Sequence, residues 1–108
     1  MKFNVTSETT ISELFYSKYL DQVREVINKW RSSLIDDDPS VDVLQLKTFC
    51  FNRGILYFNS VIFDIMRLRK CGYVKVSIAV LARFFYEHSN LSKSFDTLYS
   101  RMRSYSKV

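Results

Sequence analysis

The first third of the chain carries apolar residues at helical spacing. Between Tyr16 and Leu34 they recur every three or four residues, which places them on one face of a helix. Just before this run, Thr10 and Glu13 form the Thr-x-x-Glu pattern of a capping box. The spacing therefore predicts a first helix from about Ile11 to Ser33. Its apolar positions are Tyr16, Leu20, Val23, Ile27, Trp30 and Leu34.

Three consecutive aspartates and a proline interrupt the pattern after this helix. Asp38 is a good N-cap, and Pro39 suits the first position of a helix, where no amide donor is needed. Negative charge also complements the positive end of a helix dipole. A metal site made by Asp36, Asp37 and Asp38 is the alternative, but consecutive loop residues seldom converge on one ion. The pattern favours a solvated helix start.

The middle of the chain, from Val41 to Lys70, is apolar on nearly all sides of a helical projection. Such a helix must be buried by several neighbours. Gly54 is unfavourable inside a helix, so we expect a kink or break near Asn52 to Gly54. One helix, two helices and a partly stranded segment all remain open, because short apolar runs are ambiguous. The proposed stripe is Leu44, Phe51, Ile55, Phe58, Ile62 and Ile65, widened by Leu46, Cys50 and Phe63.

Two shorter amphipathic helices are predicted after Gly72, which suits the left-handed position that ends the middle helix behind Arg67, Arg69 and Lys70. Tyr73 to Val76 is a short strand or an extended linker. Ser77 caps a helix that ends near His88, with Ile78, Leu81, Ala82 and Phe85 inward. Ser89 and Asn90 make the turn, with Asn90 suited to the left-handed conformation. Ser92 or Ser94 caps the final helix, whose inner stripe is Phe95, Leu98, Met102 and Tyr105.

Composition agrees with a helical domain. The 108 residues are 47% hydrophobic, which provides a core, and include only two Gly and one Pro, which disfavours all-β folds and Gly-rich phosphate loops. Lys2 to Thr6 suits a short strand or a frayed end. We expect an all-α single domain of four to five helices, with residues 1–71 supporting a C-terminal helix-turn-helix in residues 72–108.

The cellular setting is predicted from the cysteines and the N-terminus. Cys50 and Cys71 are 21 positions apart and form no CxxC pair, so we expect free, partly buried thiols and neither a disulfide framework nor a zinc site. Met1 to Leu14 is polar and lacks the apolar region of a signal peptide. The longest uncharged apolar run, Gly54 to Phe63, is too short to span a bilayer. These features predict a soluble cytoplasmic protein without a cofactor.

Charge is distributed unevenly between the two parts of the chain. From Met66 onward, nine basic and two acidic residues give a net charge of +7, whereas the stretch before it, with seven basic and nine acidic residues, has −2. Such asymmetry suggests a nucleic-acid partner on the basic side. The nine cations are Arg67, Arg69, Lys70, Lys75, Arg83, Lys93, Arg101, Arg103 and Lys107.

The final helix has the side chains that a groove-reading helix needs. If its apolar stripe packs inward, the opposite face carries hydroxyls for base edges together with Lys and Arg for guanine or phosphate. Ser92 and Ser94 are placed to bind a phosphate at the helix start. Ala82 and Leu91 are nine apart, about one helical turn more than usual for the motif. The predicted DNA-binding residues are Lys75, Lys93, Ser94, Thr97, Ser100, Arg101, Arg103, Ser104 and Lys107.

The segment from Gly72 to Ser104 resembles the C-terminal part of RteC-type regulators of Bacteroides conjugative transposons. The resemblance is carried by a Gly-aromatic turn at Gly72-Tyr73, by Leu81-Ala82-Arg83-Phe84-Phe85, by Asn90-Leu91, and by Arg101-Met102-Arg103. It covers under a third of the chain, and the spacing before Arg101 differs. It implies a small DNA-binding protein of a mobile element and identifies no base-contacting residue.

Catalysis is not expected. His88 is the only histidine, and a lone histidine at a helix end is more often a cap or a surface residue than a base. The chief alternative to a DNA-binding transcriptional regulator is a non-catalytic interaction module with a basic surface. Tyr16, Tyr19 and Trp30, with the apolar middle segment, are candidates for a homodimer interface. For Trp30 we favour the core of the monomer. Double-stranded DNA is the expected partner, and a homodimer is compatible with DNA binding.

Overall fold

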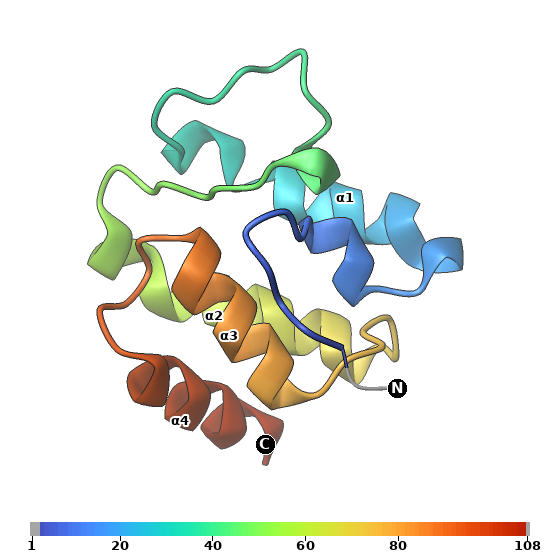
Figure 1. Cartoon of the computed structure of the whole chain (residues 1–108), viewed down its shortest axis with the longest axis vertical. Helices are drawn as coiled ribbons and strands as arrows, with labels where there is room; N and C mark the ends of the chain where they lie inside the picture. The colour runs from blue at the N-terminus through green and yellow to red at the C-terminus, as the bar shows by residue number, and fades with distance from the viewer. Residues whose placement is uncertain (1–2, 108) are drawn as a thin grey trace.

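Four α-helices and several short 3-10 turns make up the computed structural model, which describes residues 3–107 (Figure 1). The fold class is therefore all-α, as predicted, and within the described residues the backbone forms isolated β-bridges but no strand. None of the helices between Phe3 and Lys107 combines the length and apolar character needed to cross a bilayer. The helices are α1 (Leu20–Asn28), α2 (Gly54–Lys70), α3 (Ile78–His88) and α4 (Phe95–Ser106).

The prediction of one helix from Ile11 to Ser33 is wrong, because the chain leaves the helical conformation at Phe15. This residue is extended, with φ −121° and ψ 154°, and forms an antiparallel bridge with Val74. The bridge buries Phe15, which is 2% exposed, against a segment that no local period could reveal. The region is instead divided into 3-10 turns at Ile11–Leu14, Ser17–Tyr19 and Arg31–Ser33, with α1 between the last two.

The Thr10–Glu13 interaction of the predicted capping box is present. The backbone amide of Thr10 donates to Glu13 Oε2 at 2.7 Å. It stabilises a single 3-10 turn, not the long helix that we expected. Of the segment Lys2 to Thr6, Lys2 lies outside the described residues, and Phe3 to Thr6 is in no regular element.

The middle segment is not one helix. Asp38 and Pro39 do not begin a helix: the carbonyl of Asp38 accepts from the Val41 amide in a turn, and its Oδ1 accepts from Ser40. A 3-10 turn at Val43–Gln45 follows, and the chain then runs without regular structure to Arg53. The helical period was misleading here, because these apolar side chains reach the core from a backbone that is not helical.

Long-range backbone hydrogen bonds hold this irregular stretch in the core. The Phe49 amide donates to the His88 carbonyl at 2.7 Å, and the Ile35 amide donates to the Cys50 carbonyl at 2.7 Å. Phe49 and Phe51 are 0% and 1% exposed. Satisfied backbone groups allow an irregular segment to lie in the interior without the penalty of unpaired amides.

The break expected near Asn52 to Gly54 is confirmed, because α2 begins at Gly54 and the residues just before it are not helical. A Cβ at this position would lie 2.8 Å from the backbone oxygen of Asn90, so only glycine allows the turn before α4 to approach so closely. The first turn of α2 extends beyond the core. Ile55 is 83% exposed and Phe63 is 49% exposed, which corrects their assignment to the buried stripe, whereas Ile62 and Ile65 are buried.

The end signals predicted for the C-terminal half are confirmed. Gly72 follows α2 with φ +83°. Ser77 caps α3, and its Oγ accepts from the Val80 amide. Of the two serines considered for the last helix, Ser94 is the cap, because its Oγ accepts from the Thr97 amide at 3.3 Å. Asn90 is not left-handed: among the described non-glycine residues only Asp36 has a positive φ.

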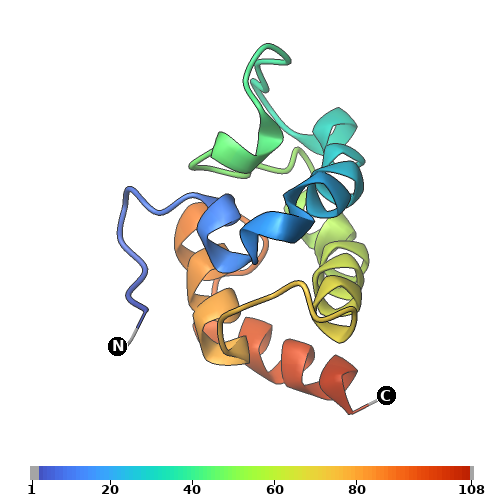
Figure 2. The same ribbon diagram turned by 90° about the vertical axis from the view of Figure 1, so that its right-hand side faces the viewer.

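The helices surround one aromatic core. In Figure 2, α4 lies below α2 and α3 and closes the lower end of the space between them. Trp30 lies at the centre, 4% exposed, with its ring edge-on to Phe49, Phe51 and Phe85 at centroid distances of 6.0–6.1 Å. Its Nε1 donates to Asp64 Oδ2 at 2.9 Å. This placement confirms Trp30 as a core residue of the monomer.

Candidate nucleic-acid interface

The last helix is oriented as its pattern predicts. Leu98 and Met102 are fully buried, and Phe95 and Tyr105 are half-buried at the margins of the contact. The opposite face points away from the molecule. Its side chains are those predicted to read DNA, and all of them are exposed: Lys93, Ser94, Thr97, Ser100, Arg101, Arg103, Ser104 and Lys107.

The two arginines of α4 flank this face on opposite sides. Arg101 lies on the side toward α2, with its guanidinium 5.9 Å from the centre of the Phe58 ring. Arg103 lies on the other side, with its guanidinium 5.5 Å from the centre of the ring of Tyr99, one turn earlier in α4. Lys75 is exposed but is not part of α4: it lies between α2 and α3, where its amide donates to the Leu14 carbonyl. Asp96 is exposed in the first turn of α4 and is the acidic residue of the face.

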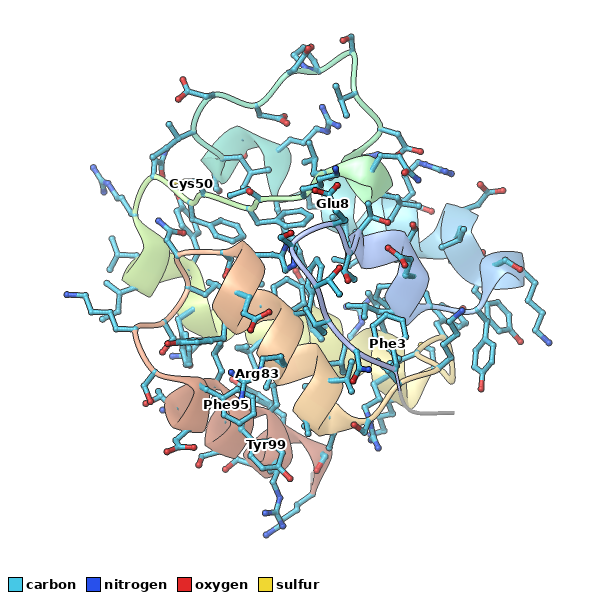
Figure 3. The ribbon with its side chains drawn as sticks, in the orientation of Figure 1. Phe3, Glu8, Cys50, Arg83, Phe95 and Tyr99 are labelled. Atoms are coloured by element: carbon cyan, nitrogen blue, oxygen red, sulfur yellow. The ribbon has the colours of Figure 1, made fainter. Side chains whose placement is uncertain are left out.

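Two stacked rings between two arginines fix one flank of α4 against α3. The guanidinium of Arg83 lies 4.1 Å from the centre of the Phe95 ring, which stacks on Tyr99 at 5.7 Å, and Arg103 follows. Figure 3 shows Arg83, Phe95 and Tyr99 together over α4. Sequence reasoning did not find this arrangement, because it depends on how two helices meet. Arg83 is thereby half-buried, which separates its role from that of the exposed cations.

The C-terminal cations have no acidic partners among the residues that the structure describes. Between Met66 and Lys107, none of the nine takes part in an ion pair. The ion pairs of the described chain join Arg24, Arg31 and Lys47 to aspartate or glutamate in the N-terminal half. The positive charge on α4 is therefore free to meet an external anion.

The connection between α3 and α4 is six residues long, Ser89 to Ser94. Its residue Asn90 ties it to the segment before α2. The Phe51 amide donates to Asn90 Oδ1 at 2.8 Å, and Asn90 Nδ2 donates to the Phe51 carbonyl at 2.7 Å. Leu91 adds an apolar anchor, 2% exposed. The turn is longer than the three or four residues usual between the helices of a helix-turn-helix. The pair of amide bonds was not predictable from the sequence.

A groove opens between the start of α2 and this turn, with a volume of about 620 Å³. Ile55, Phe58 and Leu91 supply apolar surface, and Lys93 and Arg101 supply positive charge. No carboxylate lines it. The groove shares Lys93, Thr97 and Arg101 with the outward face of α4, so the two surfaces are continuous.

His88 is a core residue, which corrects its assignment to a cap or the surface. It is 4% exposed and stacks on Phe84 at a centroid distance of 4.5 Å. Its Nδ1 lies 2.6 Å from the Lys47 carbonyl oxygen and its Nε2 lies 2.9 Å from the Thr6 carbonyl oxygen. The ring therefore lies between the backbone carbonyls of two distant segments and is enclosed by the core.

Other candidate groups are dispersed. Within residues 3–107, no group of three His, Cys, Asp or Glu side chains is close enough to hold a metal ion. Asp37 pairs with Arg31 while Asp38 bonds Ser40, so these neighbouring aspartates face different partners. Cys50 and Cys71 are free, but Cys71 is exposed where partial burial was expected.

The proposed dimer residues do not form one exposed patch. Trp30 is buried in the core and is unavailable to a partner, while Tyr19 is half-buried and stacks on Tyr73 at 4.5 Å. Tyr16 is 46% exposed. A homodimer built on these three side chains together is not compatible with this packing.

Comparison of the chain with protein-family models, curated proteins and solved structures finds no match.

Proposed function

We propose that this protein is a small DNA-binding regulator that inserts α4 into the major groove of double-stranded DNA. The observation that carries the proposal is the outward face of α4. It combines hydroxyls at Thr97, Ser100 and Ser104 with the cations Lys93 and Arg101, all exposed and none engaged in an ion pair. Hydroxyls accept or donate at either base edge, and Arg and Lys bind guanine or phosphate.

In this proposal α3, the turn and α4 act as a helix-turn-helix. The helix α3 packs against α4, and the Arg83–Phe95 contact sets their relative position. Leu81, Ala82 and Phe85 of α3 are fully buried. The six-residue turn replaces the usual shorter one. Lys93 and the N-cap Ser94 immediately precede α4, which favours phosphate contacts at the entrance to the DNA major groove.

The resemblance of Gly72 to Ser104 to RteC-type regulators favours the same function and a mobile-element setting. A monomer of this size covers few base pairs, so regulators of this class commonly bind as dimers with half-sites about one DNA turn apart. The role is non-catalytic and needs no cofactor.

The test measures binding to a mixed-sequence duplex of about 30 base pairs by fluorescence anisotropy, at several salt concentrations between about 50 and 200 mM. The variant Lys93→Ala/Arg101→Ala should bind about tenfold or more weakly and should lower the slope of log affinity against log salt by about 2. The matched control is Lys18→Ala/Lys29→Ala, which removes the same charge from exposed positions of the N-terminal half.

Equal losses in the two double variants would mean that only net charge matters and that the α4 face is not the interface. No binding by the parent at about 50 mM salt would reject the function itself.

A second function is favoured by a separate observation. Ile55 and Leu56 are 83% and 67% exposed at the start of α2, beside a groove with cations. Adjacent exposed aliphatic side chains favour a protein-interaction module. If the protein is an interaction module that does not bind DNA, the parent should cause no change in the anisotropy of the labelled duplex. The Lys18→Ala/Lys29→Ala variant should then bind a protein partner as well as the parent does.

A further inference from the structure

The groove beside α4 has a definite chemistry. One part is apolar, formed by Ile55, Phe58 and Leu91, and another is cationic, formed by Lys93 and Arg101. Because no carboxylate lines the groove, an occupant gains most if it presents aliphatic side chains next to negative charges.

The loop between Leu34 and Asp42 presents this complementary combination. Ile35 and Val41 are 45% and 36% exposed, and Asp36 and Asp38 are exposed between them. Asp36 is held at φ 54°, the single positive φ among the described non-glycine residues. The neighbouring Asp37 turns to Arg31 and fixes the base of the loop. The loop therefore projects two aliphatic side chains and two carboxylates into solvent.

The loop does not fill the groove of its own chain. Its base lies beside the segment that leads into α2, because the Ile35 amide donates to the Cys50 carbonyl, and the loop rises from there to the top of the molecule in Figure 1. No residue of the loop is among those that line the groove. The fold turns the loop away from the groove and leaves both surfaces open, so each is available to a second copy.

We propose that the Ile35–Val41 loop of one copy binds the groove of a second copy, in a head-to-tail association. Ile35 and Val41 pack on Ile55 and Phe58, while Asp36 and Asp38 approach Lys93 and Arg101. The contact is heterologous, so each added copy leaves a free loop at one end and a free groove at the other. The inference does not depend on DNA binding, although DNA would compete for Lys93 and Arg101.

The interface is small, so the association is weak and is measured by sedimentation velocity from about 10 μM to about 1 mM protein. The mean mass should rise with concentration and fall again when salt is added. The salt effect is informative, because the chain carries +5 overall and screening of general repulsion alone would strengthen association.

Charge exchange tests the pairing itself. Asp36→Lys/Asp38→Lys and Lys93→Glu/Arg101→Glu should each associate at least tenfold more weakly than the parent. A mixture of the two should associate again, because each loop then meets an oppositely charged groove on the other variant. Glu25→Lys/Glu87→Lys is the control for the first variant, since both glutamates are exposed and change the charge equally.

Three results would overturn the proposal: a parent that stays monomeric up to about 1 mM, two variants that associate like the parent, or a mixture that does not recover. Asp36→Lys alone, which leaves the Asp38–Ser40 bonds in place, guards against a loop that has simply unfolded. Ile55→Ser, which leaves every charge unchanged, should also weaken association; equal association by this variant would remove the apolar half of the contact.

Discussion

The two halves of the described chain use charge in different ways. From Phe3 to Arg53, arginines and a lysine pair with carboxylates and so fasten irregular backbone: Arg24 bonds Asp42 and Asp21, and Lys47 reaches across to Glu8. From Gly54 to Lys107, helices carry the fold, and the cations form no ion pairs. A charge that is neutralised internally supports the structure, whereas a charge left unpaired on a rigid helix is available for recognition.

The ion pairs of the N-terminal half also change the pKa values of the carboxyl groups that take part in them. Hydrogen bonds from Arg24 hold the pKa of the Asp42 carboxyl below its usual range. The bond from Lys47 lowers the pKa of Glu8 in the same way. Because both folded-state pKa values are depressed, the stabilisation is present above the ordinary pKa and is lost as pH falls through the lowered one. The cations of α4 form no such ion pairs within the described residues.

The largest effect is expected where the two halves share one core. Trp30→Ala removes a buried ring that contacts Phe49, Phe51 and Phe85 and leaves Asp64 without its indole partner. The free energy of unfolding should fall by about 3–5 kcal/mol, as is typical of buried aromatic truncations. Urea denaturation followed by circular dichroism measures the change.

Trp30→Phe is the matched variant, because it keeps most of the apolar volume but removes the hydrogen bond to Asp64. It should cost about 1–2 kcal/mol. A loss below about 1 kcal/mol for Trp30→Ala would place the ring outside the core and reject this packing.

The next effect concerns the link between the irregular half and the α3–α4 turn. Asn90→Ala leaves the amide and the carbonyl of Phe51 without partners, at an expected cost of about 1–3 kcal/mol. Gly54→Ala tests the same approach from the other side, because the new methyl would lie 2.8 Å from the Asn90 carbonyl oxygen. Thermal denaturation compares both with the parent.

Alanine normally favours a helix over glycine by about 1 kcal/mol. A Gly54→Ala protein as stable as the parent, or more so, would therefore contradict the close packing of the turn on α2.

Local signals in the sequence were enough wherever one helical turn decides the outcome. Gly72, Ser77 and Ser94 end or begin helices through contacts within four residues, and the predictions at these positions are confirmed. The outward face of α4 was also predictable, because Leu98 and Met102 determine which side is buried. Periodicity alone located this part of the candidate site.

The remainder depends on pairings between distant segments. Phe15 forms a bridge with Val74, and the Phe49 amide donates to the His88 carbonyl. The apolar side chains that fit a helical period therefore belong to extended backbone, which buries them in the core. The groove was missed for the same reason: Ile55 was assigned to a buried stripe, and only the approach of Asn90 to Gly54 explains why α2 begins there. No local pattern contains that information.

The smallest effect sharpens the contrast between the halves by removing one charge from each. Asp96 is exposed on the α4 face, and Glu25 is exposed on α1. If α4 enters the DNA groove, Asp96→Asn should tighten binding to the mixed-sequence duplex about threefold, because a carboxylate near phosphates is repelled even in water. Glu25→Gln changes the net charge equally and should leave the affinity nearly unchanged.

Stability should move in the opposite direction. Asp96 lies in the first turn of α4, where negative charge complements the helix dipole, so Asp96→Asn should lose about 0.3–1 kcal/mol of unfolding free energy. Tighter DNA binding by a less stable protein cannot arise from general stabilisation of the fold. Equal affinities of the two variants, measured by anisotropy at about 50 mM salt, would mean that the field around α4 is not what DNA meets.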